Sequence, residues 1–279
     1  MTSLPAATSA TRNSRPQTVL TVLRREELSP HMVRIIVGGD GFSSYTNNAF
    51  EDRYVKIAFP QPGVAYDEPL DLWKVRETMP REQWPYTRTY TVRWVDAAAR
   101  ELAIDFVVHG DEGLAGPWAA TALPGDTIIF TGPGGGYNPD PAADWYLFAG
   151  DEAALPAIAA AIESLPEDAL GKAYLEVDNE ADIQAVAAPA GVELNWLQRR
   201  GTPAGSSELL IDAVRNGEWL NGRVHVFAHG ERGYMKALRD VFFVQRGLER
   251  SQVSLSGYWA KGRVEDDFQA EKQLPIGKI

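Results

Sequence analysis

Cysteine is absent from this chain of 279 residues, and long apolar runs are absent too. Without cysteine there are no disulfide bonds, no thiolate nucleophiles and no cysteine-ligated iron–sulfur clusters. Any redox function must therefore depend on an organic cofactor that is held non-covalently. No apolar run approaches the roughly 18 residues of a transmembrane helix, so we expect no membrane insertion.

Positive charge is also scarce, because 27 lysines and arginines face 38 acidic residues and the formal net charge is −11. Proteins that bind nucleic acids normally show a basic field, so we expect no nucleic-acid partner. An anionic ligand must then be met by a local basic patch.

The chain begins with residues rich in alanine, threonine, serine and proline and without the apolar segment of a secretory signal. We therefore expect a disordered tail over residues 1–16 and a cytoplasmic location. The length favours two domains, and the hydrophobic content of 44% is enough for two cores.

The first half of the chain shows the periodicity of strands, with turn residues between the runs. Six short strands predict a small antiparallel barrel over residues 17–137. An insert over residues 60–87 interrupts it, and loops of this length are usually functional or mobile. The six predicted strands cover residues 18–28, 31–39, 54–59, 88–95, 101–108 and 126–132.

The second half alternates short apolar runs with helical patterns, which predicts a mostly parallel α/β sheet over residues 144–264. We expect a linker around Asn138-Pro139-Asp140-Pro141 and a C-terminal tail over residues 265–279. A barrel followed by an α/β layer is the arrangement of ferredoxin-reductase-like flavoenzymes, which is a fold analogy and does not establish chemistry.

The segment Arg88-Thr89-Tyr90-Thr91 is the strongest functional signal. Side chains two apart in a strand share a face at about 6.8 Å, so Arg88 and Tyr90 project together. Arginine forks a phosphate and keeps its charge, and an aromatic ring suits a flat cofactor. Gly116 and Pro117 read as a helix start that favours a diphosphate. Together they predict a flavin dinucleotide site, and the alternative is an ordinary edge strand with a surface arginine.

Residues 88–161 resemble the siderophore-interacting protein family of FAD-containing ferric-siderophore reductases. The matching segments are RTYTVR, DFVVHGDEGLAGPWA, PGDTIIFTGPGGGY, DWYLFAGDEAALPAI and, near the C-terminus, SGYWAKG. The resemblance extends over roughly residues 17–268. Many family members read GPAxxWA where this chain reads AGPWAA, so its phosphate loop differs in detail.

The resemblance implies roles for individual residues. Tyr90 would lie against the flavin ring and Thr91 near its N5 edge, which makes these two the catalytic candidates; otherwise both are ordinary strand residues, since both types favour strands. His109 by itself is more typical of a hydrogen-bonded structural residue. The implied FAD-binding set is Arg88, Tyr90, Thr91, Asp105, Val107, His109, Gly116, Pro117, Trp118 and Ala119.

Asp151 and Glu152 follow the first predicted strand of the second domain. Ligands of open α/β sheets bind beyond the carboxyl ends of the strands. The resemblance therefore implies that this turn faces the nicotinamide nucleotide, NADH or NADPH, whereas the residues alone favour helix capping because two acids repel a pyrophosphate. His225 and His229 have no further ligands at a recognisable spacing, so we predict no metal site.

Trp259, Lys261 and Arg263 come at and after the last predicted strand. In the resembling family this end folds back toward the flavin and helps to form the siderophore pocket. Ferric siderophores are often anionic, so a pair of cations in an acidic protein is meaningful. The alternative is a solvated basic turn.

The resemblance and the residues together predict an FAD-dependent reductase of ferric siderophores that uses NAD(P)H and releases iron as Fe(II). A flavin is needed because a hydride carries two electrons and iron accepts one. Two alternatives stay open. One is a flavin reductase that exchanges electrons with a protein carrier such as ferredoxin, and the other is a siderophore-binding protein with no catalytic cycle.

Overall fold

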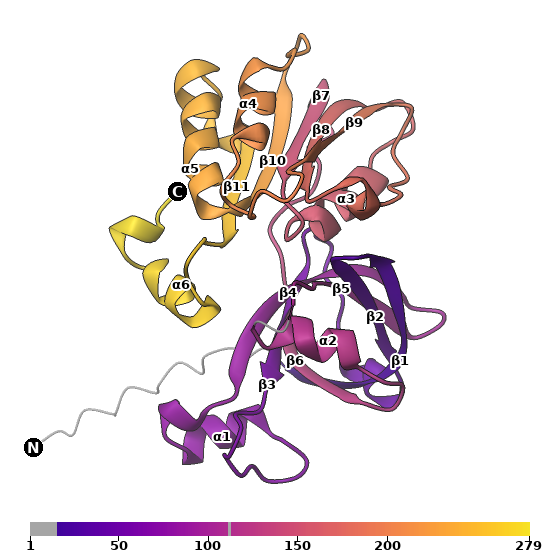
Figure 1. The fold of residues 1–279 in the computed structure, drawn as a ribbon. Helices are drawn as coiled ribbons and strands as arrows, with labels where there is room; N and C mark the ends of the chain where they lie inside the picture. The colour runs from indigo at the N-terminus through magenta and orange to yellow at the C-terminus, as the bar shows by residue number, and fades with distance from the viewer. Residues whose placement is uncertain (1–15, 111–112) are drawn as a thin grey trace, which may run out of the picture.

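Two domains stand one above the other in the computed structural model, which describes residues 16–110 and 113–279 (Figure 1). The tail that we expect over residues 1–16 lies outside this part of the chain, except for its last residue. Within the described residues, no helix combines the length and the apolar character needed to cross a membrane.

The N-terminal domain is a closed barrel that contains all six predicted strands, each antiparallel to its neighbours. The strands are β1 (Gln17–Ser29), β2 (Met32–Gly38), β3 (Tyr54–Phe59), β4 (Tyr86–Asp96), β5 (Glu101–Val107) and β6 (Thr127–Gly134). Their order around the barrel is β1-β2-β5-β4-β3-β6. Successive side chains point to opposite faces, so Leu102, Ile104 and Phe106 of β5 all enter the core.

The insert between β3 and β4 is folded rather than irregular. It contains α1 (Leu72–Thr78), whose first turn is capped by the Asp71 carboxylate accepting from the backbone N–H groups of Trp73 and Lys74. Leu70, Leu72 and Val75 form a small core of its own against the barrel. Two short 3₁₀ turns, η1 (Asp40–Ser44) and η2 (Arg81–Gln83), flank β3 and the insert.

The C-terminal domain is a five-stranded parallel sheet in the order β11-β10-β7-β8-β9. Its strands are β7 (Trp145–Gly150), β8 (Leu170–Val177), β9 (Gly191–Gln198), β10 (Val224–Glu231) and β11 (Val253–Trp259). The central strand β7 is buried along its whole length, because helices cover both faces of the sheet. The fold therefore has the ferredoxin-reductase-like arrangement that the sequence predicts.

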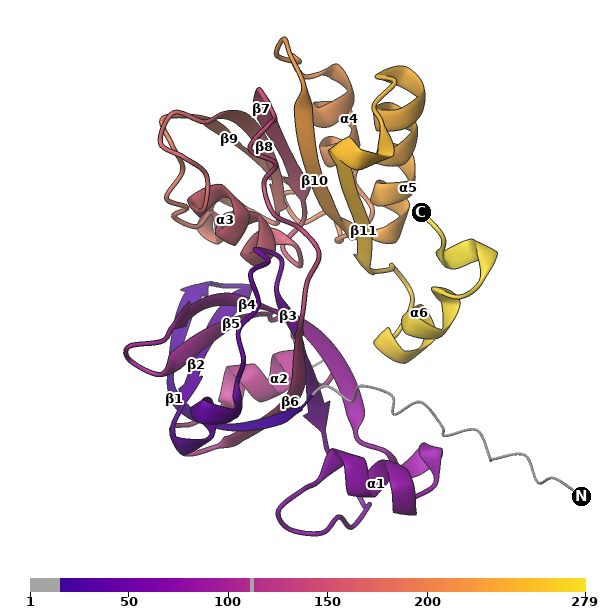
Figure 2. The same cartoon turned by 180° about the vertical axis from the view of Figure 1, so that it is seen from behind.

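One helix packs on the barrel side of this sheet and two pack on the other side (Figure 2). The helices are α3 (Leu155–Glu163) on the first face and α4 (Leu209–Asn216) and α5 (Arg232–Asp240) on the second. The π turn η4 (Val241–Gln245) extends α5, and the 3₁₀ turns η3 (Glu180–Asp182) and η5 (Arg250–Gln252) precede β9 and β11. A short helix of the barrel domain, α2 (Ala115–Thr121), connects β5 to β6.

Residues 265–279 do not form the tail that we expect from the sequence. They contain α6 (Glu265–Glu271) and the 3₁₀ turn η6 (Pro275–Gly277). Phe268 is only 1% exposed, and the Glu271 carboxylate pairs with the Arg232 guanidinium at 2.5 Å. The buried aromatic ring and this ion pair help to fix an otherwise acidic segment beside the barrel (Figure 1).

Candidate functional site

An open strand edge marks the candidate cofactor site of the barrel. Residues 86–91 of β4 pair with β3 on one side, and pairing with β5 begins only at Val92. Among the described strands, none pairs with the other side of this stretch. Unpaired strand edges offer backbone groups to a ligand, so this half of β4 can hold a flat or extended molecule.

Arg88 and Tyr90 lie on this stretch and share one face of β4, as the strand period predicts. They stand opposite Ile57 and Val55 of β3. The Tyr90 ring packs against Phe106, with ring centroids 4.4 Å apart. Burial raises the pKa of the Tyr90 hydroxyl, so this phenol stays neutral at all physiological pH values.

The environment of Arg88 tests whether this site suits an anion. The Arg88 side chain is 16% exposed, and one of its guanidinium nitrogens lies 3.2 Å from the Asp266 carboxylate of α6. A carboxylate of the chain itself thus stands at Arg88, where a phosphate of the cofactor would bind. The donor fits an FAD phosphate, which would share the guanidinium with Asp266 or displace it.

Helix α2 contributes to this site less directly than the sequence suggests. A Cβ atom on Gly116 would stand 3.1 Å from the Val107 carbonyl oxygen, so glycine permits the close contact between α2 and β5. Ala119 is fully buried in the barrel core, and the Trp118 ring packs on Phe106 at 5.5 Å. Pro117 has no N–H group, and the Trp118 N–H already donates to a backbone carbonyl.

The predicted alternation of Asp105, Val107 and His109 stops early, because β5 ends at Val107 and the exposed His109 lies beyond the strand. Asp105 is 3% exposed and accepts two hydrogen bonds from the Arg34 guanidinium at 2.7 and 2.8 Å. The two residues stand directly opposite each other on β2 and β5. This bidentate ion pair accounts for the buried carboxylate without a ligand.

Thr91 leaves β4 on the face opposite to Tyr90 and is 6% exposed. The Thr91 side chain lies beside the Tyr258 hydroxyl of β11, so it is at the contact between the domains. A flat ring stacked on Tyr90 would therefore meet Thr91 only at the ring edge. Burial is the main cause that raises the pKa of Tyr258, and the neighbouring Thr91 side chain partly opposes it.

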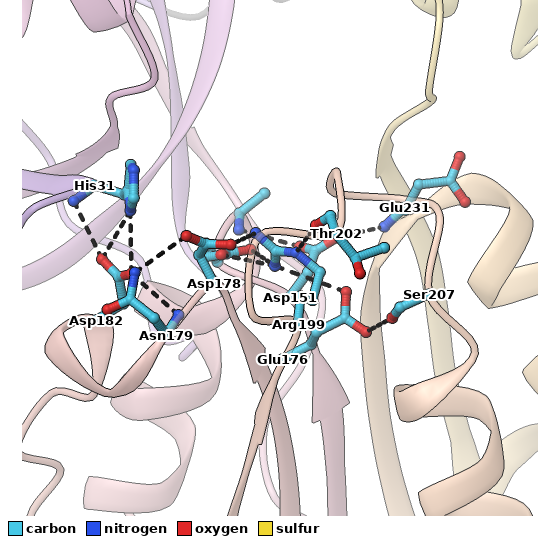
Figure 3. Close-up of polar contacts among 12 residues, drawn as sticks. His31, Asp151, Glu176, Asp178, Asn179, Asp182, Arg199, Thr202, Ser207 and Glu231 are labelled. Carbon is cyan, nitrogen blue, oxygen red and sulfur yellow. Dashed lines mark hydrogen bonds and ion pairs between the residues drawn. The ribbon is translucent and has the colours of Figure 1, made fainter.

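The carboxyl edge of the parallel sheet is strongly acidic (Figure 3). Glu152 follows β7, and its carboxylate pairs with the Arg199 guanidinium at 2.7 Å. The same guanidinium lies 3.7 Å from the Glu176 carboxylate. Burial raises the pKa of Glu176. Asp151 is also at this edge, as predicted, but Glu152 is already committed to Arg199. The carboxylates around Arg199 and at the neighbouring strand ends are Asp151, Glu152, Glu176, Asp178 and Glu231.

The three predicted substrate residues have different surroundings. The Trp259 indole N–H donates to the Asp151 carboxylate at 2.8 Å. Lys261 is exposed, and its ammonium donates to the Ser206 hydroxyl. Arg263 is exposed too, but its Nε pairs with the Glu271 carboxylate at 2.7 Å. The charge of Arg263 is therefore partly balanced, whereas no carboxylate of the described residues forms an ion pair with Lys261.

The histidines of β10 have structural surroundings. His225 Nδ1 accepts from the Asp140 backbone N–H at 3.0 Å. His229 Nε2 lies 3.0 Å from the Ser254 hydroxyl, and burial lowers the pKa of His229 to about 3. The ring is thus neutral at physiological pH.

A second group of polar residues joins the two domains. Asp182 of η3 is 1% exposed and accepts from the backbone N–H and the Nδ1 atom of His31, at 3.2 and 3.0 Å (Figure 3). Asp178 lies beside them, and the ligand-type atoms of the three side chains are within 4.8 Å of one another. The Asp182 oxygens and Asp178 already accept hydrogen bonds from the protein, so we interpret this group as a contact between the domains.

We expect Asp182→Ala to weaken this contact. The substitution removes the partner of the His31 ring and leaves the Asn179 N–H group without its acceptor, which typically costs about 1–3 kcal/mol. The urea midpoint of unfolding should fall, and the exposed Asp168→Ala should leave it unchanged. An unaltered midpoint for Asp182→Ala would show that the contact contributes nothing to stability.

Three residues with structural roles at these sites are not among the predicted site residues. Tyr258 lies inside the GYW motif, where strand alternation places it on the face opposite to Trp259. Arg199 directly follows a predicted strand, so its place at the carboxyl edge was accessible from the pattern. The apolar run VHVFAH predicts a strand over residues 224–229, but β10 continues to Glu231, so the role of Glu231 depends on a strand boundary that periodicity does not fix.

Two family models match this chain. Residues 21–137 match the siderophore-interacting FAD-binding domain, and residues 143–262 match the siderophore-interacting protein model. The first range covers the barrel with its open β4 edge, and the second covers the parallel sheet up to the basic turn after β11.

Two curated relatives are named for a reductase activity. Ferric vibriobactin reductase ViuB of Vibrio cholerae is 30% identical over 261 residues, which cover 92% of this chain and 94% of the relative. The NADPH-dependent ferric-chelate reductase of Escherichia coli is 30% identical over 264 residues, which cover 93% of this chain and 99% of the relative.

Solved structures agree with the fold. A siderophore utilization protein from T. fusca superposes with a TM-score of 0.78 at 38% identity, covering 89% of this chain and 94% of that protein. A ferredoxin NADP+ reductase from Neisseria gonorrhoeae gives a TM-score of 0.64 at 14% identity, covering 87% and 99%. The second match supports the ferredoxin-reductase-like fold alone.

Proposed function

Because this chain belongs to the siderophore-interacting protein family, we propose that it is an FAD-dependent reductase of ferric siderophores. In this proposal NADH or NADPH supplies the electrons, and iron leaves the siderophore as Fe(II). The names of the two curated relatives support a ferric chelate as substrate, and one of them supports NADPH as donor.

The observation that carries the proposal is the open edge of β4 within the segment that matches an FAD-binding domain. Arg88 offers a partly buried guanidinium for a phosphate, and Tyr90 offers a neutral ring for stacking.

The chain's own residues would bind FAD, orient its ring and shield the edge of that ring. Arg88 would hold the phosphate end of FAD, Tyr90 would fix the plane of its ring, and the Thr91–Tyr258 pair would close the ring edge against the second domain. Bound FAD would supply the conversion between a two-electron donor and a one-electron acceptor. The siderophore itself ligates the iron, so the protein needs no iron ligands.

The electron donor is tested by adding NADH or NADPH to the anaerobic protein and recording flavin absorbance. We expect either nucleotide to bleach the flavin without a second protein, although the acidic carboxyl edge disfavours a pyrophosphate. Bleaching by reduced ferredoxin alone would favour the protein-carrier alternative. A flavin that no donor reduces would favour a siderophore-binding protein without a catalytic cycle.

A further inference from the structure

Asp151 directly follows β7 and lies against Trp259, one of the predicted substrate residues, and it is 2% exposed. It accepts hydrogen bonds from the Trp259 indole N–H and the Glu231 backbone N–H, both at 2.8 Å. A third bond comes from the Ala153 backbone N–H at 3.0 Å. This one buried carboxylate thus connects the turn after β7 with the ends of β10 and β11.

Glu231 extends this connection to Lys261. Its carboxylate accepts from the backbone N–H groups of Lys261 at 3.1 Å and of Tyr234 at 3.0 Å. Packing is tight here as well, since a Cβ atom on Gly205 would stand 3.1 Å from the Trp259 ring and 3.3 Å from Lys261 Cβ. Asp151 therefore holds the indole of Trp259, and Glu231 holds the backbone of Lys261.

We propose that Asp151 is a positioning residue for the siderophore end of β11, holding Trp259 directly and Lys261 through Glu231 only while its carboxylate is charged. The inference rests on the proposed function, because it takes Trp259 and Lys261 as residues that face the substrate. The sequence suggests that Asp151 contacts the nicotinamide nucleotide, whereas this inference gives Asp151 a role in binding the siderophore.

The surroundings of Asp151 favour proton uptake near neutral pH. Burial, reinforced by the Glu152 carboxylate, raises the pKa of Asp151 to about 7, and the hydrogen bonds from Trp259 and Glu231 act in the opposite direction. Glu176 on β8 adds to the negative field, and Tyr258 on β11 lies within the same field. The nearby cation Arg199 is paired with Glu152 and is not bonded to Asp151.

Protonation weakens the carboxylate as an acceptor, since charge-assisted hydrogen bonds are roughly twice as strong as neutral ones. Above about pH 7 the charged carboxylate holds Trp259, and below it the hold loosens. We therefore expect the substrate site to bind the ferric siderophore less tightly in mild acid.

The test uses protein whose flavin has been photoreduced, so that no nucleotide is involved. Its oxidation by a ferric hydroxamate siderophore is followed across a series of siderophore concentrations at about pH 6, 7 and 8. The half-saturating concentration should rise roughly three- to tenfold from pH 8 to pH 6 in the wild type, because a neutral acid is about half as strong an acceptor as a carboxylate. It should be nearly constant in Asp151→Asn, whose amide does not titrate.

Two further variants separate positioning from general destabilisation. Trp259→Phe removes the indole donor, so the pH dependence of its half-saturating concentration should shrink to the part that reaches Lys261 through Glu231. Asp178→Asn alters another acid of the same edge that does not contact Trp259, and it should keep the wild-type profile. Equal pH profiles for the wild type and Asp151→Asn, or a full wild-type profile in Trp259→Phe, would overturn the proposal.

Two readouts do not depend on siderophore turnover. The indole fluorescence of the wild type should change near pH 7, and this change should be missing in Asp151→Asn and in Trp259→Phe. Because the folded state takes up the Asp151 proton near pH 7 and the unfolded state near pH 4, wild-type stability falls as pH rises between these values. The melting temperature of Asp151→Asn relative to the wild type should therefore increase with pH over this range. A wild type that never reduces the siderophore would end the proposed function, whereas these two readouts would still decide the role of Asp151.

Discussion

Arg88→Ala is expected to weaken FAD binding roughly 10- to 150-fold, because a hydrogen bond to a charged group is typically worth about 1.5–3 kcal/mol. The purified wild type should be yellow, and the released flavin should be FAD. Titration of apoprotein with FAD, followed by quenching of flavin fluorescence, gives the two dissociation constants.

Two matched variants sharpen this expectation. Arg88→Lys keeps the positive charge but loses the planar guanidinium, so its dissociation constant for FAD should lie between those of the wild type and Arg88→Ala. Asp266→Asn removes the carboxylate that now pairs with Arg88, and it should tighten FAD binding at most a few-fold, since exposed ion pairs are worth about 0–1 kcal/mol. A colourless protein that takes up no FAD would remove the flavin site, and bound FMN would contradict the diphosphate argument.

The sequence predicts the barrel, the parallel sheet and the shared face of Arg88 and Tyr90, because all three follow from the periodicity of side chains along short segments. A strand repeats every two residues, so the face of Tyr90 is readable without any knowledge of its neighbours. The carboxyl edge is readable for the same reason, since Asp151 directly follows an apolar run that is too short for a helix.

The interactions of these residues are less accessible, because they depend on register and on distant segments. Asp105 pairs with Arg34 through the alignment of β2 with β5, which no local pattern specifies. The segment after residue 264 carries one buried aromatic, Phe268, among acidic residues, so it lacks the apolar stripe that predicts a packed helix. Its helix is held by long-range contacts to Arg232 and Arg88.

The acidic turn after β7 shows how local periodicity and contacts between distant segments combine. The sequence places Asp151 and Glu152 at the ligand edge but leaves their partners open. In the structure Glu152 is balanced by Arg199, while Asp151 is turned toward Trp259. Adjacent acids thus have different roles, which only the strand order of the sheet decides.

Lys261→Glu is expected to raise the apparent KM for an anionic ferric siderophore roughly 30-fold at low salt. Two unit charges at about 4 Å interact with about 1 kcal/mol in water, and charge reversal doubles the change to about 2 kcal/mol. Lys261 is suited to this role because it is exposed and its ammonium contacts the neutral Ser206 hydroxyl. Arg263→Glu should have a smaller effect, since Glu271 already balances that charge.

The dependence of KM on salt concentration provides a second measurement in the same experiment. The Debye length shrinks from about 10 Å at 0.1 M to about 3 Å at 1 M, so the wild-type KM should rise with salt and approach that of Lys261→Glu. Steady-state reduction of a ferric catecholate, with a ferrous-specific trap reporting the product, measures both constants. Lys74→Glu makes the same charge change on α1 in the barrel insert and controls for net charge. Equal KM values for the wild type and Lys261→Glu at low salt would assign Lys261 to a solvated turn, because a cation that contacts the substrate cannot be reversed without changing the attraction.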